Sequence, residues 1–176
     1  ADLLQYTELS DEQREFAETI LSSAEHLLAI INDVLDFSKI EAGRLEIEDI
    51  PFDLTRSLKT ALDPLALQAK NKSIGLTTRI DAEVPNFIRG DQLRIRQVLF
   101  NLVGNSVKFT EKGGVILSVK LLDASDLESY GEFLRMQFSI TDTGIGIPEA
   151  KLKDIFDSFS QADSSNTRQY GGTGLG

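Results

Sequence analysis

The chain of 176 residues contains no cysteine and only one histidine, His26. The lack of cysteine excludes disulfide bonds and cysteine-based metal sites, and it favours a reducing compartment. No apolar run approaches the length that spans a membrane, and the sequence shows no signal peptide. We therefore expect a cytoplasmic segment that makes no membrane contact itself, although the full-length protein can still be membrane-attached.

Positive charge is also scarce, because 18 lysine and arginine residues face 28 aspartate and glutamate residues, for a net charge of −10. This excess of acid argues against a general nucleic-acid-binding protein and against binding to anionic membranes. Hydrophobic residues make up 41% of the chain, which is ordinary for a globular protein. The length fits one globular domain plus a smaller element.

Apolar residues recur at helical spacing from about Ser10 to Ile40, which predicts one long amphipathic helix. Asp11 and Glu12 suit its first turn, and the sequence from Glu41 to Gly43 offers a stop. A single helix cannot bury such a stripe, so it needs partner helices.

The rest of the chain alternates between helical and strand patterns. Helices are predicted at 53–70, from Asp91 to about 110, and at 148–156, and strands at 45–50, 74–81, 115–121 and 133–141. Helices on a mostly antiparallel mixed sheet make an α+β fold, a two-layer α/β sandwich.

The segment 142–148, Asp-Thr-Gly-Ile-Gly-Ile-Pro, follows a strongly alternating strand. Asp142 shares the parity of the apolar residues Phe138 and Ile140, so it points toward the buried face if the strand persists. An unpaired buried carboxylate costs several kcal/mol, which would mark a functional site. The alternative is that the strand stops earlier and the segment is an ordinary turn.

The helix that begins after Asp91 has an unusual polar face. Gln97, Asn101, Asn105 and Lys108 follow one another at offsets of four, four and three, so they form one stripe. A solvent-facing stripe normally carries Glu and Lys, whereas two Asn lower helix propensity. This local conflict indicates a site. An ordinary solvated face is the alternative.

Residues 161–176 begin polar and end with four glycines in six positions. Such a loop can bring backbone N–H groups close to phosphates. It lacks the Gly-x-x-x-x-Gly-Lys-Ser/Thr pattern of a P-loop, and no apolar strand precedes it. A flexible linker is the alternative reading.

Taken together and in this order, these segments resemble the catalytic core of sensor histidine kinases of the hybrid type, whose ATP-binding domain is similar to that of gyrase-type and chaperone-type ATPases. The matching segments are 101–110 (N box), 142–148 (G1 box), 154–163 (F box) and 171–176 (G2 box). Residues 26–54 resemble the second dimerisation helix and its exit into the ATP-binding domain.

The resemblance implies ATP and Mg²⁺ as cofactors. It implies catalytic roles for Asn101, Asn105 and Lys108, with Asn105 as the Mg²⁺ ligand and Lys108 on the phosphates. Asn101 stands where hydrolytic relatives carry a water-activating Glu, and an amide cannot serve as a general base. Asp142 would bind the adenine amino group. The remaining nucleotide-binding residues implied are Gly144, Gly146, Ile147, Phe156, Phe159, Gly172, Thr173, Gly174 and Leu175. For Phe156 and Phe159, simple core packing is an equal alternative.

The resemblance also implies the domain organisation. Residues 1–43 would be a partial dimerisation region. It would lack the H box, the Ser-His-Glu-like segment of the first dimerisation helix that carries the phosphoacceptor histidine. Residues 44–176 would be an ATP-binding domain that stops at the G2 box. His26 lies on the second helix, so the phosphoacceptor role does not carry over to it. The implied partners are a second copy, through the N-terminal helix, and a response-regulator receiver domain. The function that the resemblance implies is that of a protein-histidine kinase, which transfers the γ-phosphoryl of ATP to a histidine outside this sequence and from there to a receiver-domain aspartate. A nucleotide-responsive dimerisation module without transfer activity is the alternative, and a hydrolysing ATPase is disfavoured by Asn101.

Overall fold

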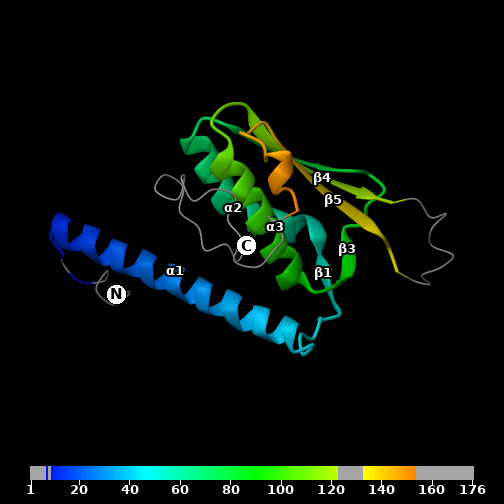
Figure 1. The fold of residues 1–176 in the computed structure, drawn as a ribbon, viewed down its shortest axis with the longest axis horizontal. Coiled ribbons are helices and arrows are strands. Elements are labelled where there is room, and N and C mark those ends of the chain that lie inside the picture. Colours follow the sequence, from blue (N-terminus) through cyan, green and yellow to red (C-terminus); the bar gives the residue numbers. More distant parts are fainter. Residues whose placement is uncertain (1–6, 8, 123–132, 154–176) are drawn as a thin grey trace. The chain divides into compact units, whose positions relative to one another are not determined.

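The computed structural model describes residues 7, 9–122 and 133–153 (Figure 1). The chain divides into two compact units, of which one is Ile47–Leu152 and the other comprises the residues on either side of it. Among the helices in the described ranges, none is both long enough and apolar enough to cross a membrane.

The N-terminal unit contains one long helix, α1, which runs from Asp11 to Glu41. Ser10 caps it with a capping box, because its Oγ accepts from the N–H of Gln13 at 3.2 Å and Gln13 Oε1 accepts from the N–H of Ser10 at 3.0 Å. At the other end Gly43 turns the chain with a φ of +63°. These caps confirm the predicted helix and both of its ends.

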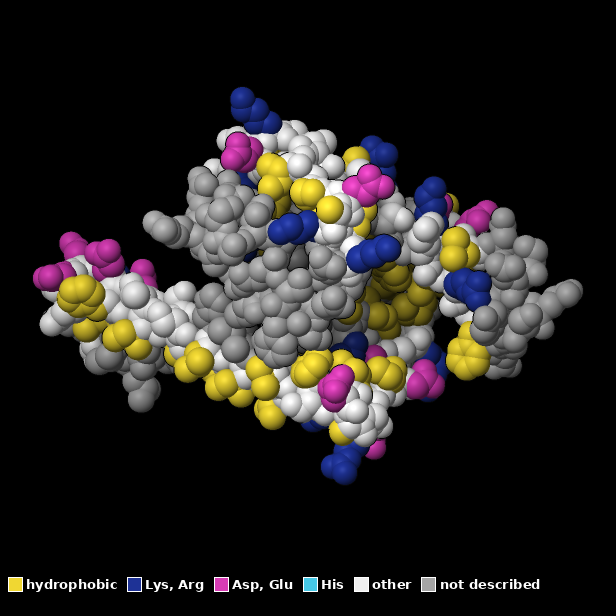
Figure 2. Space-filling model, viewed as in Figure 1, with side chains coloured by type: hydrophobic (Ala, Val, Ile, Leu, Met, Phe, Trp, Pro, Cys, Tyr) yellow, Lys and Arg dark blue, Asp and Glu magenta, His cyan; other side chains and the backbone are white. Residues whose placement is uncertain are grey.

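The apolar residues of α1 lie largely on its surface. Figure 2 shows a row of apolar side chains along this helix. The exposed members are Phe16, Ile20, Leu27, Leu28, Ile31, Val34, Leu35 and Ile40. A surface helix normally buries such a stripe against another element.

The second unit is an α+β fold with two layers, as predicted. Its elements are β1 (Ile50–Asp53), α2 (Leu54–Asn71), β2 (Gly75–Ile80), β3 (Phe87–Gly90), α3 (Gln92–Phe109), β4 (Gly114–Leu121), β5 (Met136–Asp142) and a 3₁₀ turn, η3 (Glu149–Lys151). One sheet has the order β2-β4-β5, with β2 parallel and β5 antiparallel to β4, and β1 pairs with β3 in a two-stranded antiparallel sheet. Helices α2 and α3 pack on one face of the larger sheet (Figure 1).

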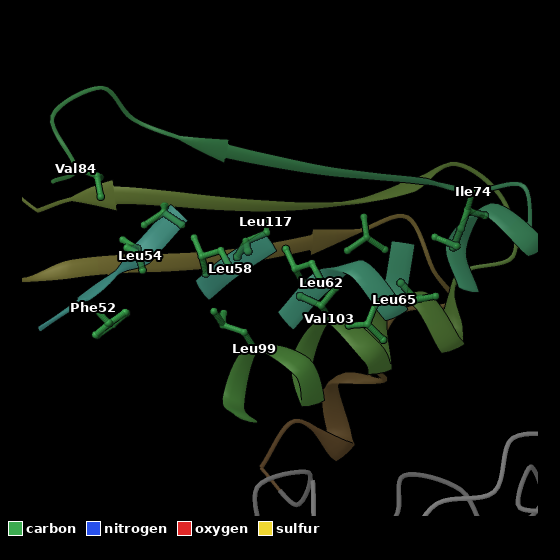
Figure 3. Packing of buried hydrophobic residues seen from close by; sticks show 14 residues of the cluster. Phe52, Leu54, Leu58, Leu62, Leu65, Ile74, Val84, Leu99, Val103 and Leu117 are labelled. Carbon is green, nitrogen blue, oxygen red and sulfur yellow. The ribbon is translucent and has the colours of Figure 1, made fainter. Parts of the chain in front are cut away.

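The core lies between these two helices and β4. Each helix contributes residues at helical spacing, and β4 contributes alternate residues, so both periodicities point into one apolar layer (Figure 3). The residues that are at most 3% exposed include Leu54, Leu58 and Leu65 of α2, Leu99, Val103 and Val107 of α3, and Val115, Leu117 and Val119 of β4.

The strand predicted at 45–50 is wrong except for its last residue, and β3 was not predicted. The two differences have one cause. Ile50 is opposite Gly90 in the ladder, and the next residue, Asp91, already caps α3, so β3 offers no further partner to the residues before Ile50. Those residues are held by side chains instead: Glu48 N–H donates to Asp91 Oδ2 at 3.3 Å, and Arg89 Nη2 donates to the carbonyl of Asp49 at 2.8 Å.

Two further boundaries differ from the prediction. Strand β5 begins at Met136 rather than at 133, because its ladder with β4 ends where Met136 faces Leu121. Phe133 is 77% exposed. After Pro148 the described chain forms a single 3₁₀ turn rather than a helix up to 156, and residues 154–156 lie outside the described residues.

Candidate functional site

Helix α3 presents an apolar face and a polar face, and the apolar face sets its orientation. Leu99, Val103 and Val107 are buried in the core. The start of the helix is fixed by Asp91, which is 7% exposed and whose Oδ1 accepts from the N–H of Arg94 at 2.9 Å. With one face and the N-terminus fixed, the opposite face is held in place as well.

That opposite face carries the predicted stripe of Gln97, Asn101, Asn105 and Lys108. Asn105 is exposed, and the other three side chains are half-buried. Gln97 Oε1 accepts a hydrogen bond from Arg94 Nη1 at 2.9 Å. Lys108 Nζ lies 5.2 Å from the centre of the Phe109 ring, at cation–π distance. The stripe therefore combines amide groups with one cation on one helix face.

Asp142 is the last residue of β5, so the strand persists as the parity argument required. It stands opposite the buried Val115 of β4. The expected burial is nevertheless wrong, because Asp142 is exposed. The core covers β5 only as far as the half-buried Ile140. Asp142 Oδ1 accepts from the N–H of Gly144 at 2.9 Å, which folds the carboxylate back over its own loop.

The loop after β5 crosses the C-terminal end of α3 at close range. The N–H of Ile145 donates to the carbonyl of Phe109 at 3.4 Å. A Cβ atom on Gly144 would lie 2.7 Å from that carbonyl oxygen and 2.9 Å from Asp142 Oδ1, so only glycine fits there. This approach brings the loop with Asp142 to the end of the helix that carries Lys108.

Thr143 fastens the same loop to the start of β4. Its Oγ1 donates to the carbonyl of Lys112 at 2.7 Å and accepts from the N–H of Gly114 at 3.0 Å. Sequence reasoning assigned no role to Thr143. No local signal could have revealed one, because its partners lie about thirty residues away in the sequence.

The other predicted nucleotide-binding residues divide into two groups. Gly146 adopts a φ of +70° and Ile147 is exposed in the loop after β5. The second group lies outside the described residues and comprises Phe156, Phe159, Gly172, Thr173, Gly174 and Leu175.

Within the described part of the chain, no three His, Cys, Asp or Glu residues gather into a metal centre. The amide oxygens of Gln97, Asn101 and Asn105 on the polar face of α3 are hard donors of the kind that Mg²⁺ accepts.

Two protein-family models match the chain. Residues 90–176 match the model of histidine kinase-, DNA gyrase B- and HSP90-like ATPases, and residues 1–43 match the His kinase A (phospho-acceptor) domain. The chain belongs to the sensor histidine kinases. The four boxes recognised in the sequence all lie within the first of these matches.

Relatives of this histidine kinase core are long signalling proteins. It is 46% identical over 170 residues to the signal transduction histidine-protein kinase BarA of Escherichia coli (strain K12), covering 97% of the chain and 18% of BarA. It is 43% identical over 177 residues to the hybrid signal transduction histidine kinase A of Dictyostelium discoideum, covering 100% of the chain and 8% of that protein. The chain thus spans less than a fifth of these relatives.

Solved structures share the fold of this chain. Full-length ShkA in complex with AMPPNP matches with a TM-score of 0.74 and 34% identity, over 98% of this chain and 34% of ShkA. The Acinetobacter baumannii histidine kinase AdeS shares the fold with a TM-score of 0.67 at 19% identity, over 98% of this chain and 74% of AdeS.

The close approach at Gly144 generates a stability prediction. Gly144→Ala should lower the free energy of unfolding by about 1 to 3 kcal/mol, because the added Cβ forces the loop away from the Phe109 carbonyl. Gly104→Ala is the matched control: a Cβ there meets Leu65 Cδ2 at an ordinary 3.7 Å. Alanine in a helix interior is favoured by roughly 0.5 to 1 kcal/mol, so this control should gain stability. Urea denaturation followed by circular dichroism measures both. Equal stability of the two variants would contradict the packing described.

Proposed function

We propose that this chain binds Mg-ATP between the polar face of α3 and the loop after β5, and that it supports transfer of the γ-phosphoryl group to a histidine. The observation that carries the proposal is the approach of Gly144 and Ile145 to the Phe109 carbonyl. This approach brings the loop that follows Asp142 to the helix that carries Asn101, Asn105 and Lys108. The AMPPNP complex of ShkA supports the choice of nucleotide.

The adenine end of the site is assigned to Asp142. Its carboxylate accepts one hydrogen bond from the N–H of Gly144 and has capacity for more. The exocyclic amino group of adenine is a donor that a carboxylate can select, and a base that offers an acceptor there would be rejected. Gly144 and Gly146 keep side chains away from the base.

The phosphate end is assigned to Asn105 and Lys108. The chain as a whole has a net charge of −10 and repels an anionic ligand. Lys108 contributes a positive charge next to the phosphates, which attracts the ligand locally. Asn105 would contribute an amide oxygen to Mg²⁺, which neutralises charge on phosphate oxygens when bound. We assign the closure over the phosphates to the segment with Gly172, Thr173, Gly174 and Leu175, and the anchoring of that segment to Phe156 and Phe159.

Asn101 determines what happens to the γ-phosphoryl group. It lies one helical turn before Asn105. A side chain that activates water must accept a proton, and an amide does not do so near neutral pH. Water is therefore a poor acceptor in this site, and the phosphoryl group remains available to a histidine. We propose a receiver-domain aspartate as the next acceptor and the cytoplasm as the location.

The helical unit supplies the second proposal. We infer that residues 1–43 form part of a dimerisation bundle and that residues 44–176 form the ATP-binding domain. The apolar row along α1 supports this, because eight large apolar side chains of α1 are more than 40% exposed. A second copy can cover that face with an identical one.

Mg-ATP binding should depend on two separate side chains. Asp142→Asn should weaken ATP binding by roughly 1 to 3 kcal/mol, the size of a hydrogen bond to a charged group, and should reduce the preference for ATP over GTP. Asn105→Ala should chiefly remove the dependence on Mg²⁺. Isothermal titration with and without Mg²⁺ measures both effects, with Asn71→Ala as an exposed control at the end of α2. Unchanged affinity and Mg²⁺ dependence in both variants would refute the site.

Phosphoryl transfer should require a histidine other than His26. Given labelled ATP, the chain should phosphorylate a separate helical protein that carries a Ser-His-Glu box, and His26→Gln should do so equally well. Asn101→Glu should raise the steady-state release of phosphate, because a carboxylate can accept a proton from water. Nucleotide binding without any transfer to the partner would favour the alternative, a nucleotide-responsive dimerisation module. Fast phosphate release by the parent chain would favour a hydrolysing ATPase.

The apolar face of α1 should drive self-association. Light scattering across a wide concentration range should show a mass that rises from monomer toward dimer. Ile31→Glu places a charge in the exposed apolar row and should shift this equilibrium toward monomer by at least tenfold in dissociation constant, since burying an unpaired charge costs several kcal/mol. Asn32→Glu adds the same charge at the neighbouring exposed position and should change little. A strict monomer at every concentration would contradict the pairing.

A further inference from the structure

Lys72 makes two strong contacts that no role described so far uses. It is the residue that caps the C-terminus of α2, and Ser73 then turns the chain with a φ of +57°. The Lys72 side chain reaches the far end of α3, where Nζ donates to the carbonyl of Val107 and to the carbonyl of Lys108, both at 2.8 Å.

These contacts complete the C-terminal end of α3. The last four carbonyls of a helix have no partner within the helix. In α3 the carbonyl of Ser106 accepts from the N–H of Thr110 at 3.1 Å, and that of Phe109 accepts from the loop after β5. Lys72 satisfies the two between them. A cation at this end also interacts favourably with the helix dipole.

The turn that Lys72 completes is the one that carries Lys108. The side chain of Val107 is 1% exposed and Thr110 is 0% exposed, so one side of this turn is packed into the core. The other side depends on Lys72 for two of its hydrogen bonds. Loss of the ammonium would leave the Val107 carbonyl, whose bond is partly buried, without this donor.

We propose that Lys72 is a positioning residue for nucleotide binding, because it holds the last turn of α3 so that Lys108 faces the phosphates. This inference rests on the proposed function, in which Lys108 contacts ATP. Two of the three Nζ donors of Lys72 are directed to these carbonyls, which assigns Lys72 to positioning rather than to contact with the nucleotide.

The test compares two lysines of one segment. Lys72→Met should weaken Mg-ATP binding about fivefold, because the last turn of α3 would no longer hold Lys108 toward the phosphates. Lys70→Met removes the same charge from an exposed position two residues earlier and should keep the affinity within about twofold of the parent, as usual for a screened surface charge. Equal losses in both variants would mean a general charge effect and would overturn the proposal. If Lys72→Met fails to fold by circular dichroism, Lys72→Gln replaces it.

A double-mutant cycle with Lys108→Met separates positioning from simple stability. If Lys72 acts through Lys108, Lys72→Met should cost less than about twofold in affinity once Lys108 is already methionine, because coupled residues are not additive. An undiminished fivefold loss in that background would overturn the proposal, as would a lower melting temperature with unchanged ATP affinity in the single variant. If Lys108→Met alone leaves ATP binding unchanged, the phosphate role proposed for Lys108 fails instead.

Discussion

The candidate site depends on one backbone approach, in which the loop after β5 passes within hydrogen-bond distance of the Phe109 carbonyl at the end of α3. Gly144 permits it, because a Cβ at this residue would collide with that carbonyl. Thr143 holds the same loop against the start of β4. This junction places the loop that follows Asp142 against the C-terminal end of the helix that carries the polar face.

Helix α3 links stability with function, because its apolar face packs in the core and its polar face carries the candidate site residues. Burial of Leu99, Val103 and Val107 against α2 and β4 fixes the rotation of the helix about its axis. The polar face on the other side of the helix is thereby presented at a defined angle. Two Asn lower the intrinsic helix propensity, and the core packing together with the caps at Asp91 and Lys72 offsets this cost. A helix held this firmly can carry residues selected for chemistry rather than for helix formation.

The N-terminal unit has the opposite character. Its helix has well-formed caps, but its apolar row is exposed. Local hydrogen bonds are thus enough to define where α1 begins and ends, whereas its apolar face needs further helices. This difference fits the bundle proposed above, in contrast to the unit Ile47–Leu152, in which two helices and a sheet already share a buried core.

The sequence by itself determined the features that depend on neighbouring residues. Caps and helical periodicity located α1, α2 and α3 to within one or two residues, and the stripe from Gln97 to Lys108 followed directly from helical spacing.

Only the tertiary structure decided the features that depend on distant partners. Strand β3 and the start of β1 are defined by each other and by the capping of α3 at Asp91, so no local pattern marked them. Asp142 has the inward parity that its spacing predicts, yet it is exposed because the core ends before it. Thr143 acquires its role from a carbonyl 31 residues away, and Lys72 from carbonyls 35 and 36 residues away, and such pairings arise only when the chain has folded.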